Sequence, residues 1–391
     1  MVATVRILQV IPYFARSMGG PVMATHRLSR ELVKRGFEVE ILTTNFRLDD
    51  EFVKQVRGDG IGVTLATCDM ALGLFLLSPS MKLWLRTRGR DFDIIHMHEF
   101  RSYQNSIVRA FASKHHIPYV LQAHGSVIPF LEKKTLKKVY DLVWGSNLLE
   151  DASILIALNE MEKEQYVFMG VAPNQITVIP NGIDSSEFHT LPEIGRFREK
   201  YGIGPTERVV LYLGRIHRIK GLDVLVSAFA EVAKEVDNAR LVIVGPDDGF
   251  LARVKKSIRE LRLENRTLFT GPLYGIDKLE AYVDSNVFVL PSRYDMFPNS
   301  VLEAMACGTP IIVSDRCGIK DKLGGAGLVF RFDSEQLKLA LLRVLNDEEL
   351  RMRQGEEGMR IVGQDFALGP IARLVETTYM DAIARAERRV T

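Results

Sequence analysis

The sequence predicts an α/β protein built from two doubly wound domains. The chain has 391 residues, more than one hydrophobic core usually serves, which favours two domains. Short apolar runs that indicate buried strands alternate with helical patterns in both halves of the chain. Such strand–loop–helix–strand units build parallel sheets, in which ligands bind where strands end and helices begin.

The most informative of these units spans residues 286–318. Residues 287–290 form an apolar run that predicts a buried strand. A polar loop with one acid, Asp295, comes next. Pro298 then suits the first turn of a helix, because a proline there gives up no hydrogen bond. A glycine is placed to end the helix, and a second buried strand follows it.

This unit carries the groups that one class of ligand requires. We expect the backbone N–H groups of Asn299, Ser300 and Val301 to be unpaired at the helix start, where they can bind phosphate. Asp295 and Glu303 lie eight residues apart and face the same crevice. Carboxylates bind sugar hydroxyls well and phosphates poorly. The combination therefore favours a sugar joined to a nucleoside through a diphosphate.

The N-terminal half begins with a similar unit. A strand is predicted over residues 5–11, and a loop with Gly19 and Gly20 lets the backbone approach a ligand before the next helix. A later strand ends just before His124, a residue type that can donate to developing charge at a strand end. The dinucleotide fingerprint G-x-G-x-x-G is absent, which argues against a nicotinamide or flavin enzyme.

The second domain opens with a strand over residues 208–213. The loop after it holds Arg215 and Lys220, two cations five residues apart that can clamp a diphosphate from two sides. Residues 185–205 before this strand are polar and rich in glycine and proline, and we interpret them as the interdomain linker.

Three motifs together resemble glycosyltransferase family 4. They are SRYDMFPNSVLEAMACGTPII at 292–312, GRIHRIKG at 214–221 and PNGID at 180–184. The resemblance covers essentially the whole chain and implies the GT-B fold, with two Rossmann-like domains facing each other across a cleft. The implied divisions are an acceptor domain over 1–185, a nucleotide-sugar domain over 186–370 and a helix over 371–391 that crosses back to the first domain.

The resemblance also implies a role for individual residues. Arg215 and Lys220 would bind the donor diphosphate, Asp295 the sugar and Glu303 the ribose, while His124 would contact the sugar near the reacting carbon. The first acid is more often Glu in the family, so the sugar itself stays open. The other positions implied to contact the donor are Gly19, Gly20, Leu273, Phe297, Pro298, Asn299 and Ser300.

We therefore expect a retaining, metal-independent glycosyltransferase that uses a UDP- or GDP-sugar and no cofactor. Its acceptor would be a glycan or lipid-linked hydroxyl, in glycan, polysaccharide or glycolipid synthesis. His96 and His98 share one strand face, but the sequence offers no third ligand for a metal. Two alternatives stay open at this point: a nucleotide-sugar 2-epimerase of the same fold, and a non-catalytic nucleotide-sugar-binding subunit.

Charge and composition bear on partners and location. The net charge of +2 gives no reason to expect nucleic acid, but residues 80–140 hold eleven Lys or Arg and four Asp or Glu, which suggests an anionic partner. Residues 70–90 and 133–138 are candidates for peripheral membrane contact, the alternative being helices packed on their own domain. Three cysteines without disulfide spacing and no signal-peptide pattern predict a cytoplasmic protein, either free or at the inner face of the membrane.

Overall fold

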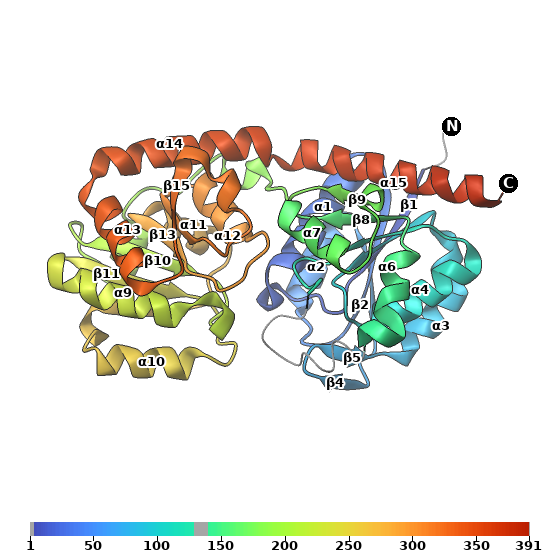
Figure 1. Cartoon of the computed structure of the whole chain (residues 1–391), viewed down its shortest axis with the longest axis horizontal. Helices are drawn as coiled ribbons and strands as arrows, with labels where there is room; N and C mark the ends of the chain where they lie inside the picture. Colours follow the sequence, from blue (N-terminus) through green and yellow to red (C-terminus); the bar gives the residue numbers. More distant parts are fainter. Residues whose placement is uncertain (1–3, 129–139, 391) are drawn as a thin grey trace. The chain divides into compact units, whose positions relative to one another are not determined.

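The computed structural model describes residues 4–128 and 140–390, with side chains to residue 388. It divides into two compact units, of which the first comprises residues 1–182 and 368–391 and the second residues 183–367. Each unit is a parallel sheet with helices on both faces (Figure 1). The α/β architecture with two doubly wound sheets predicted from the sequence is confirmed.

The first unit holds a seven-stranded parallel sheet of order β3-β2-β1-β6-β7-β8-β9. The chain moves outward from β1 in one direction as far as β3 and then returns to β6 on the other side of β1. The strands are β1 (Arg6–Val10), β2 (Glu38–Thr44), β3 (Gly62–Ala66), β6 (Ile94–His98), β7 (Tyr119–Gln122), β8 (Ile154–Ala157) and β9 (Ile176–Val178). The point between β1 and β6 is therefore a topological switch, where open α/β sheets bind ligands.

Alternating residues of these strands fill two hydrophobic cores, one on each face of the sheet. Ile7 packs in a core with α1 (Gly20–Lys34), α2 (Asp50–Gly58) and the C-terminal helix α15 (Leu368–Val390). Leu8, its neighbour, packs in the opposite core. The helices on that side are α3 (Pro79–Arg88), α4 (Tyr103–His115), α6 (Ser146–Glu150) and α7 (Glu160–Phe168). The C-terminal helix α15 thus belongs to the first unit, beside α1.

The second unit holds a six-stranded parallel sheet of order β12-β11-β10-β13-β14-β15. Its strands are β10 (Arg208–Leu213), β11 (Ala239–Val244), β12 (Thr267–Gly271), β13 (Val287–Leu290), β14 (Ile311–Ser314) and β15 (Gly327–Phe330). Its helices are α8 (Arg196–Tyr201), α9 (Leu222–Glu235), α10 (Leu251–Glu260), α11 (Gly275–Val283), α12 (Asn299–Ala306), α13 (Ser334–Asn346) and α14 (Glu348–Asp365). The switch point lies between β10 and β13.

Strand identity in the second unit follows directly from composition. The segments RVVLYL and VFVL are nearly continuous runs of Val, Leu, Phe and Tyr, the pattern of strands covered by helices on both faces. All four residues of β13 are buried, and both strands have the bounds predicted from sequence. Pro298 is the residue just before α12 rather than within its first turn.

Residues 185–205 are not the linker that the sequence suggested, because they belong to the second unit. The Arg198 guanidinium, at the centre of this segment, donates hydrogen bonds to the carbonyl oxygens of Gly204, Glu207 and Asp284 at 2.9–3.1 Å. This network fastens α8 to the edge of the unit. The polar composition predicted a linker here, but the Arg198 side chain instead attaches α8 to the rest of the second unit.

The strongly apolar segment 70–77 forms a short antiparallel hairpin of β4 (Met70–Leu72) and β5 (Phe75–Leu77). The basic segment that follows is helical, as predicted, and forms α3. The second basic run, residues 133–138, lies outside the described residues. Within the described chain, no helix has both the length and the apolar content that crossing a bilayer requires.

Candidate active site

The loops that follow β10 and β13 meet at the switch point of the second unit. Since the two strands are parallel neighbours, their carboxyl ends lie at the same edge of the sheet. Arg215 and Lys220 come after β10, and Asp295 and Pro298 come after β13. Residues separated by about eighty positions in the chain are therefore brought together by topology, at the edge where α/β sheets bind ligands.

The two cations are paired with acids. The Lys220 ammonium forms an ion pair with the Asp295 carboxylate, and both side chains are largely buried, at 17% and 14% exposure. Arg215 donates from Nη1 to Asp248, which follows β11, at 2.6 Å. Sequence analysis assigned Lys220 and Asp295 to different parts of a ligand, and the structure shows that they also contact each other. Asp248 was not singled out, because no local pattern marks it.

Close backbone contacts hold the loop after β10 against the loop after β13. The Arg293 N–H donates to the Ile219 carbonyl at 2.7 Å. Gly221 has φ of 70°, and a Cβ on it would overlap the carbonyl oxygen of Pro291. Glycine is therefore required at position 221 for two reasons: the backbone conformation favours it, and there is no space for a side chain. The glycine that closes the GRIHRIKG motif lets the cationic loop lie directly on the acidic one.

Glu303 lies on α12 and is 8% exposed. Its carboxylate pairs with the Lys278 ammonium of α11 at 2.9 Å and accepts a hydrogen bond from the Tyr282 hydroxyl at 3.3 Å. The two contacts hold the Glu303 carboxylate in one orientation. The arrangement suits a carboxylate that accepts hydrogen bonds from vicinal hydroxyls.

The start of α12 is less open than the sequence suggested. The Val301 N–H donates to the Pro298 carbonyl at 3.1 Å, so it is not one of the unpaired donors that we expected. A tight first turn of this kind satisfies the donor internally. The ring of Phe297 is buried and packs edge-on against Phe366 at 5.6 Å. The Phe297 side chain therefore contributes to packing within the second unit.

Leu273 lies in the loop between β12 and α11, at the same edge of the sheet as the residues above. Its side chain is partly exposed. A planar ring bound beside Leu273, such as a nucleobase, would contact the end of β12.

In the first unit, the glycine loop follows β1 and leads into α1. Gly19 is the residue before the helix and has φ of 93° and ψ of −147°, a conformation that favours glycine. Gly20 is the first residue of α1 and is followed by Pro21. The helix start thus lies at the switch point between β1 and β6.

His124 follows β7 and has φ of 51°, a conformation that costs a non-glycine residue about 1 kcal/mol or more. Its Nε2 lies 2.8 Å from Nδ1 of His98, whose Nε2 lies 2.7 Å from Oε1 of Gln9. The Gln9 amide nitrogen donates to the Tyr379 hydroxyl at 3.2 Å, and that hydroxyl lies 2.7 Å from Nδ1 of His96. A buried chain of hydrogen bonds therefore joins α15 to the loop after β7.

The proton positions in this chain follow from the assigned orientation of the Gln9 amide. In that orientation His98 Nε2–H donates to Gln9, His98 Nδ1 accepts from His124 Nε2–H, and the Tyr379 hydroxyl donates to His96. Burial lowers the pKa of His124 to about 3 and that of His96 to about 3, and it lowers the pKa of His98 well below its usual value. All three imidazoles are therefore neutral near pH 7.

Sequence analysis missed a buried acid beside this loop. Glu162 on α7 accepts from the Gly125 N–H at 2.5 Å and from the Leu158 N–H at 2.7 Å. Burial raises its pKa to about 7, although the two N–H groups oppose the shift. Glu162 fixes the turn that carries His124. The detectable signal in the sequence was Asn159 three residues earlier, a helix cap that accepts from the Glu162 N–H.

Metal ligation by His96 and His98 has no support in the geometry. Both rings lie side by side with centroids 4.2 Å apart, and the nitrogens of His98 face Gln9 and His124. Among the described residues, no group of three or more His, Cys, Asp or Glu side chains is placed to hold a metal ion.

The fold and the paired switch-point loops define the class of protein. The chain superposes on the Anabaena protein HepE in complex with UDP and glucose with a TM-score of 0.82 at 20% identity, over 96% of this chain and 99% of HepE. It also superposes on WaaG, a glycosyltransferase involved in lipopolysaccharide biosynthesis, with a TM-score of 0.73 at 17% identity, over 94% and 98% of the two chains. The fold is that of the GT-B glycosyltransferases.

Sequence comparison identifies the family. Residues 18–187 match the model of Glycosyltransferase Family 4, and residues 193–360 match Glycosyl transferases group 1. An uncharacterized glycosyltransferase of Methanocaldococcus jannaschii is 26% identical over 95% of this chain and 96% of its own length. The N-acetyl-alpha-D-glucosaminyl L-malate synthase of Bacillus anthracis is 26% identical over 94% and 95%. The chain belongs to glycosyltransferase family 4 and is a glycosyltransferase.

Proposed function

We propose that this enzyme transfers a sugar from a UDP- or GDP-sugar to a hydroxyl acceptor, with retention of anomeric configuration and without a metal. The observation that carries the proposal is that the loops bearing Arg215, Lys220 and Asp295 meet at one edge of the second sheet, where the helix that carries Glu303 begins. Cations, carboxylates and a helix start are there together, which is what a sugar diphosphate nucleotide requires. HepE, of the same fold, binds UDP-glucose.

The diphosphate is proposed to bind Lys220 and Arg215. Phosphate oxygens would replace the Asp295 and Asp248 carboxylates as partners of the two cations, with charge-assisted hydrogen bonds worth about 1.5–3 kcal/mol each. Ser300, at the start of α12, adds the positive end of a helix. Charge builds on the diphosphate as the glycosidic bond breaks, so these groups stabilise the transition state more than the bound donor. Two cations and a helix start here supply the charge for which other enzymes use a metal.

The carboxylates are proposed to hold the two sugars of the donor. Asp295, released from Lys220 by the phosphate, would accept hydrogen bonds from hydroxyls of the transferred sugar. Glu303, held in place by its ion pair with Lys278, would accept from the ribose hydroxyls. The base would lie against Leu273 at the end of β12. Pro298 and Asn299 would shape the wall between the two carboxylates, with Phe297 fixed behind them by Phe366.

The first unit is proposed to supply His124 and the loop of Gly19 and Gly20. With Nε2–H donated to His98, His124 presents Nδ1 as an acceptor for a hydroxyl of the transferred sugar. The sequence suggested a donor role for His124, and the tautomer of its ring decides between the two roles. A neutral acceptor fixes the sugar without repelling an oxocarbenium-like centre, as an imidazolium would. The two glycines would allow close backbone approach to the donor phosphates.

We propose that the acceptor hydroxyl attacks from the face that the diphosphate leaves, and that the leaving phosphate oxygen takes its proton. The acceptor is proposed to be a glycan or a lipid-linked hydroxyl. Membrane contact through residues 70–90 has support in the exposed side chains of Met70, Leu72, Leu74 and Leu83, which lie close in sequence to several Lys and Arg. Buried Cys307 and Cys317, both free thiols, are in keeping with a cytoplasmic location.

Donor identity can be tested by thermal shift with UDP-, GDP- and ADP-sugars, in buffer with EDTA. A donor that binds the folded protein raises the melting temperature, and Lys220→Ala should remove most of that rise. Product analysis with a candidate acceptor should then give a glycoside whose anomeric configuration matches the donor. Inverted product, or transfer that requires added divalent metal, would refute the mechanism. Epimerised nucleotide sugar formed without acceptor would instead indicate the 2-epimerase reaction.

A further inference from the structure

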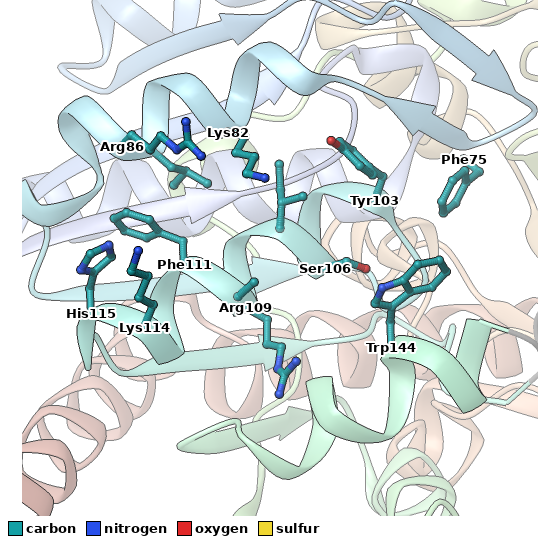
Figure 2. Close-up of a pocket in the computed structure, with 13 residues that line it drawn as sticks. Phe75, Lys82, Arg86, Tyr103, Ser106, Arg109, Phe111, Lys114, His115 and Trp144 are labelled. Atoms are coloured by element: carbon teal, nitrogen blue, oxygen red, sulfur yellow. The ribbon is translucent and has the colours of Figure 1, made fainter.

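A cavity of about 580 Å³ lies in the first unit between α3 and α4, on the face of the sheet opposite α1 and α15. It is lined by residues of the two helices together with Phe75 of β5 and Trp144 of the turn before α6 (Figure 2). A volume of this size is typical of small-molecule sites. The residues assigned to the donor above are not among those that line it, so the cavity is a separate site.

The lining is strongly basic. Lys82 and Arg86 of α3 and Lys114 and His115 of α4 all face the cavity, and none of the lining residues is acidic. Among the described residues, no carboxylate forms an ion pair with Lys82, Arg86 or Lys114. Like charges gathered without counter-charges raise the free energy of the folded protein, and a bound anion would relieve that cost.

The fifth basic residue of the lining, Arg109, differs from the others because it is paired with an acid. Arg109 of α4 also lines the cavity, but its guanidinium is turned to Asp151, with Nε to Oδ2 at 2.7 Å. Figure 2 shows this side chain directed away from the others. One basic residue of the lining is thus satisfied by the protein, while three cations remain for a ligand.

The opposite end of the cavity is aromatic. Phe75, Tyr103 and Trp144 lie together there, away from Lys114 and His115 (Figure 2). Trp144 is 45% exposed, although tryptophan is usually well buried. Leu85 and Ile107 add apolar side chains to the lining. A ligand that fills the whole cavity therefore has an anionic group at one end and an apolar group at the other.

We propose that this cavity binds a phosphate ester with an apolar substituent, with the phosphate at Lys82, Arg86 and Lys114 and the substituent along Leu85 and Ile107 toward Trp144. Phosphate fits better than carboxylate because it offers three acceptor oxygens and up to two negative charges to three cations, one of them a guanidinium fork. The ligand could come from a phospholipid at a membrane surface or from a soluble phosphorylated amphiphile. The proposal goes beyond the transfer reaction and does not depend on the donor assignment.

The test uses octyl phosphate and inorganic phosphate as soluble probes, with the full-length protein and calorimetric titration. Octyl phosphate should bind at least about tenfold more tightly than inorganic phosphate, since the apolar chain adds burial. Lys82→Glu/Arg86→Glu should weaken octyl phosphate at least about tenfold. Trp144→Ala should weaken octyl phosphate and leave inorganic phosphate unchanged.

A matched control variant distinguishes binding at the cavity from a general effect of the protein's net charge. Lys54→Glu/Lys163→Glu changes the net charge of the same unit by the same amount, at two positions away from the cavity, and should bind octyl phosphate as the wild type does. Donor-induced thermal shift should persist in Lys82→Glu/Arg86→Glu, which shows that the variant is folded and keeps the two proposals distinguishable.

Sedimentation with vesicles identifies the source of the phosphate. If vesicles of phosphatidylglycerol and phosphatidylcholine bind the wild type but not Lys82→Glu/Arg86→Glu, while phosphatidylcholine alone binds neither, the ligand is a membrane lipid. If octyl phosphate binding depends on the cavity but neither vesicle binds, the ligand is a soluble phosphate ester. The proposal is overturned if the wild type does not bind octyl phosphate, or if the cavity variant binds it as tightly as the control variant.

Discussion

Lys220 and Asp295, seventy-five positions apart in the chain, form an ion pair that joins the loop after β10 to the loop after β13. The pair sits at the switch point of the second sheet, where no single stretch of sequence could place it. We propose that, when the donor binds, a phosphate oxygen replaces Asp295 beside Lys220 and a sugar hydroxyl replaces Lys220 beside Asp295. Because each buried charge has a partner both before and after binding, neither has to be desolvated alone.

Replacing Lys220 should therefore strongly reduce transfer without unfolding the protein. Lys220→Ala is expected to lower kcat by about 10²–10³-fold, the usual cost of losing one group that stabilises transition-state charge. Steady-state kinetics and circular dichroism measure the two effects. Lys234→Ala, an exposed lysine paired with Glu231, is the control and should change neither. Near-normal turnover by Lys220→Ala would defeat the assignment of the diphosphate site.

Glu303 can be tested for a role in binding apart from its role in the fold. Glu303→Gln should lower kcat/KM about tenfold by weakening the bond to the ribose, and it should cost about 1–3 kcal/mol of stability because Lys278 loses its partner. Adding Lys278→Met should restore part of the stability and none of the donor affinity. Recovery of both in the double variant would mean that Glu303 is only structural.

The buried histidines predict acid sensitivity of the first unit. Their pKa values are lowered in the folded state, so the unfolded chain binds more protons once the pH drops below about 6.5. Stability from this source is fully present above that pH and is lost as the pH falls toward 3. A histidine with a folded pKa of about 3 then costs about 2 kcal/mol at pH 5.

Urea unfolding at pH 7 and pH 5 measures this loss. His96→Phe removes one buried imidazole and should reduce the difference between the two pH values, whatever its effect on stability at pH 7. His189→Gln, at an exposed position, should leave the difference as in the wild type. An unchanged difference in His96→Phe would show that His96 titrates normally in the folded protein.

Gly221 should tolerate no side chain. Gly221→Ala places a Cβ on the Pro291 carbonyl at a positive φ, and we expect a loss of more than about 3 kcal/mol or failure to fold. Gly249→Ala is the matched control, since φ there is 85° and nothing lies within 4 Å of the added Cβ. It should cost only about 1 kcal/mol, the price of the backbone conformation. Thermal unfolding compares the two, and equal melting temperatures would contradict the close approach of the loops.

Several site residues were identifiable from sequence because their motifs are local. Arg215 and Lys220 lie in a short loop between a strand and a helix. Asp295 and Glu303 are only eight residues apart in the sequence. The partners of these residues were not identifiable. Lys278 and Asp248 carry no motif, and they were found only because α11 and the loop after β11 reach the same edge of the sheet.

The histidine cluster shows the same limit more sharply. His96 and His98 suggested a metal pair in sequence, since alternate residues of a strand share a face. Gln9 and Tyr379 were not considered, being separated from them by 87–89 and 281–283 positions. Only the pairing of β1 with β6 and the docking of α15 place an amide and a hydroxyl beside the imidazoles and join them to His124 in one buried chain of hydrogen bonds.

The two parallel sheets, the family and the charged loops could all be predicted from the amino-acid sequence. They follow from hydrophobic periodicity and from short motifs, both of which act over a few residues. The pairs that the charges form, the burial that keeps His124 neutral and the basic cavity between α3 and α4 come from the folding of the whole chain. Electrostatic energy and pKa depend on distance and burial in space, and parallel topology brings together groups that lie far apart in the chain.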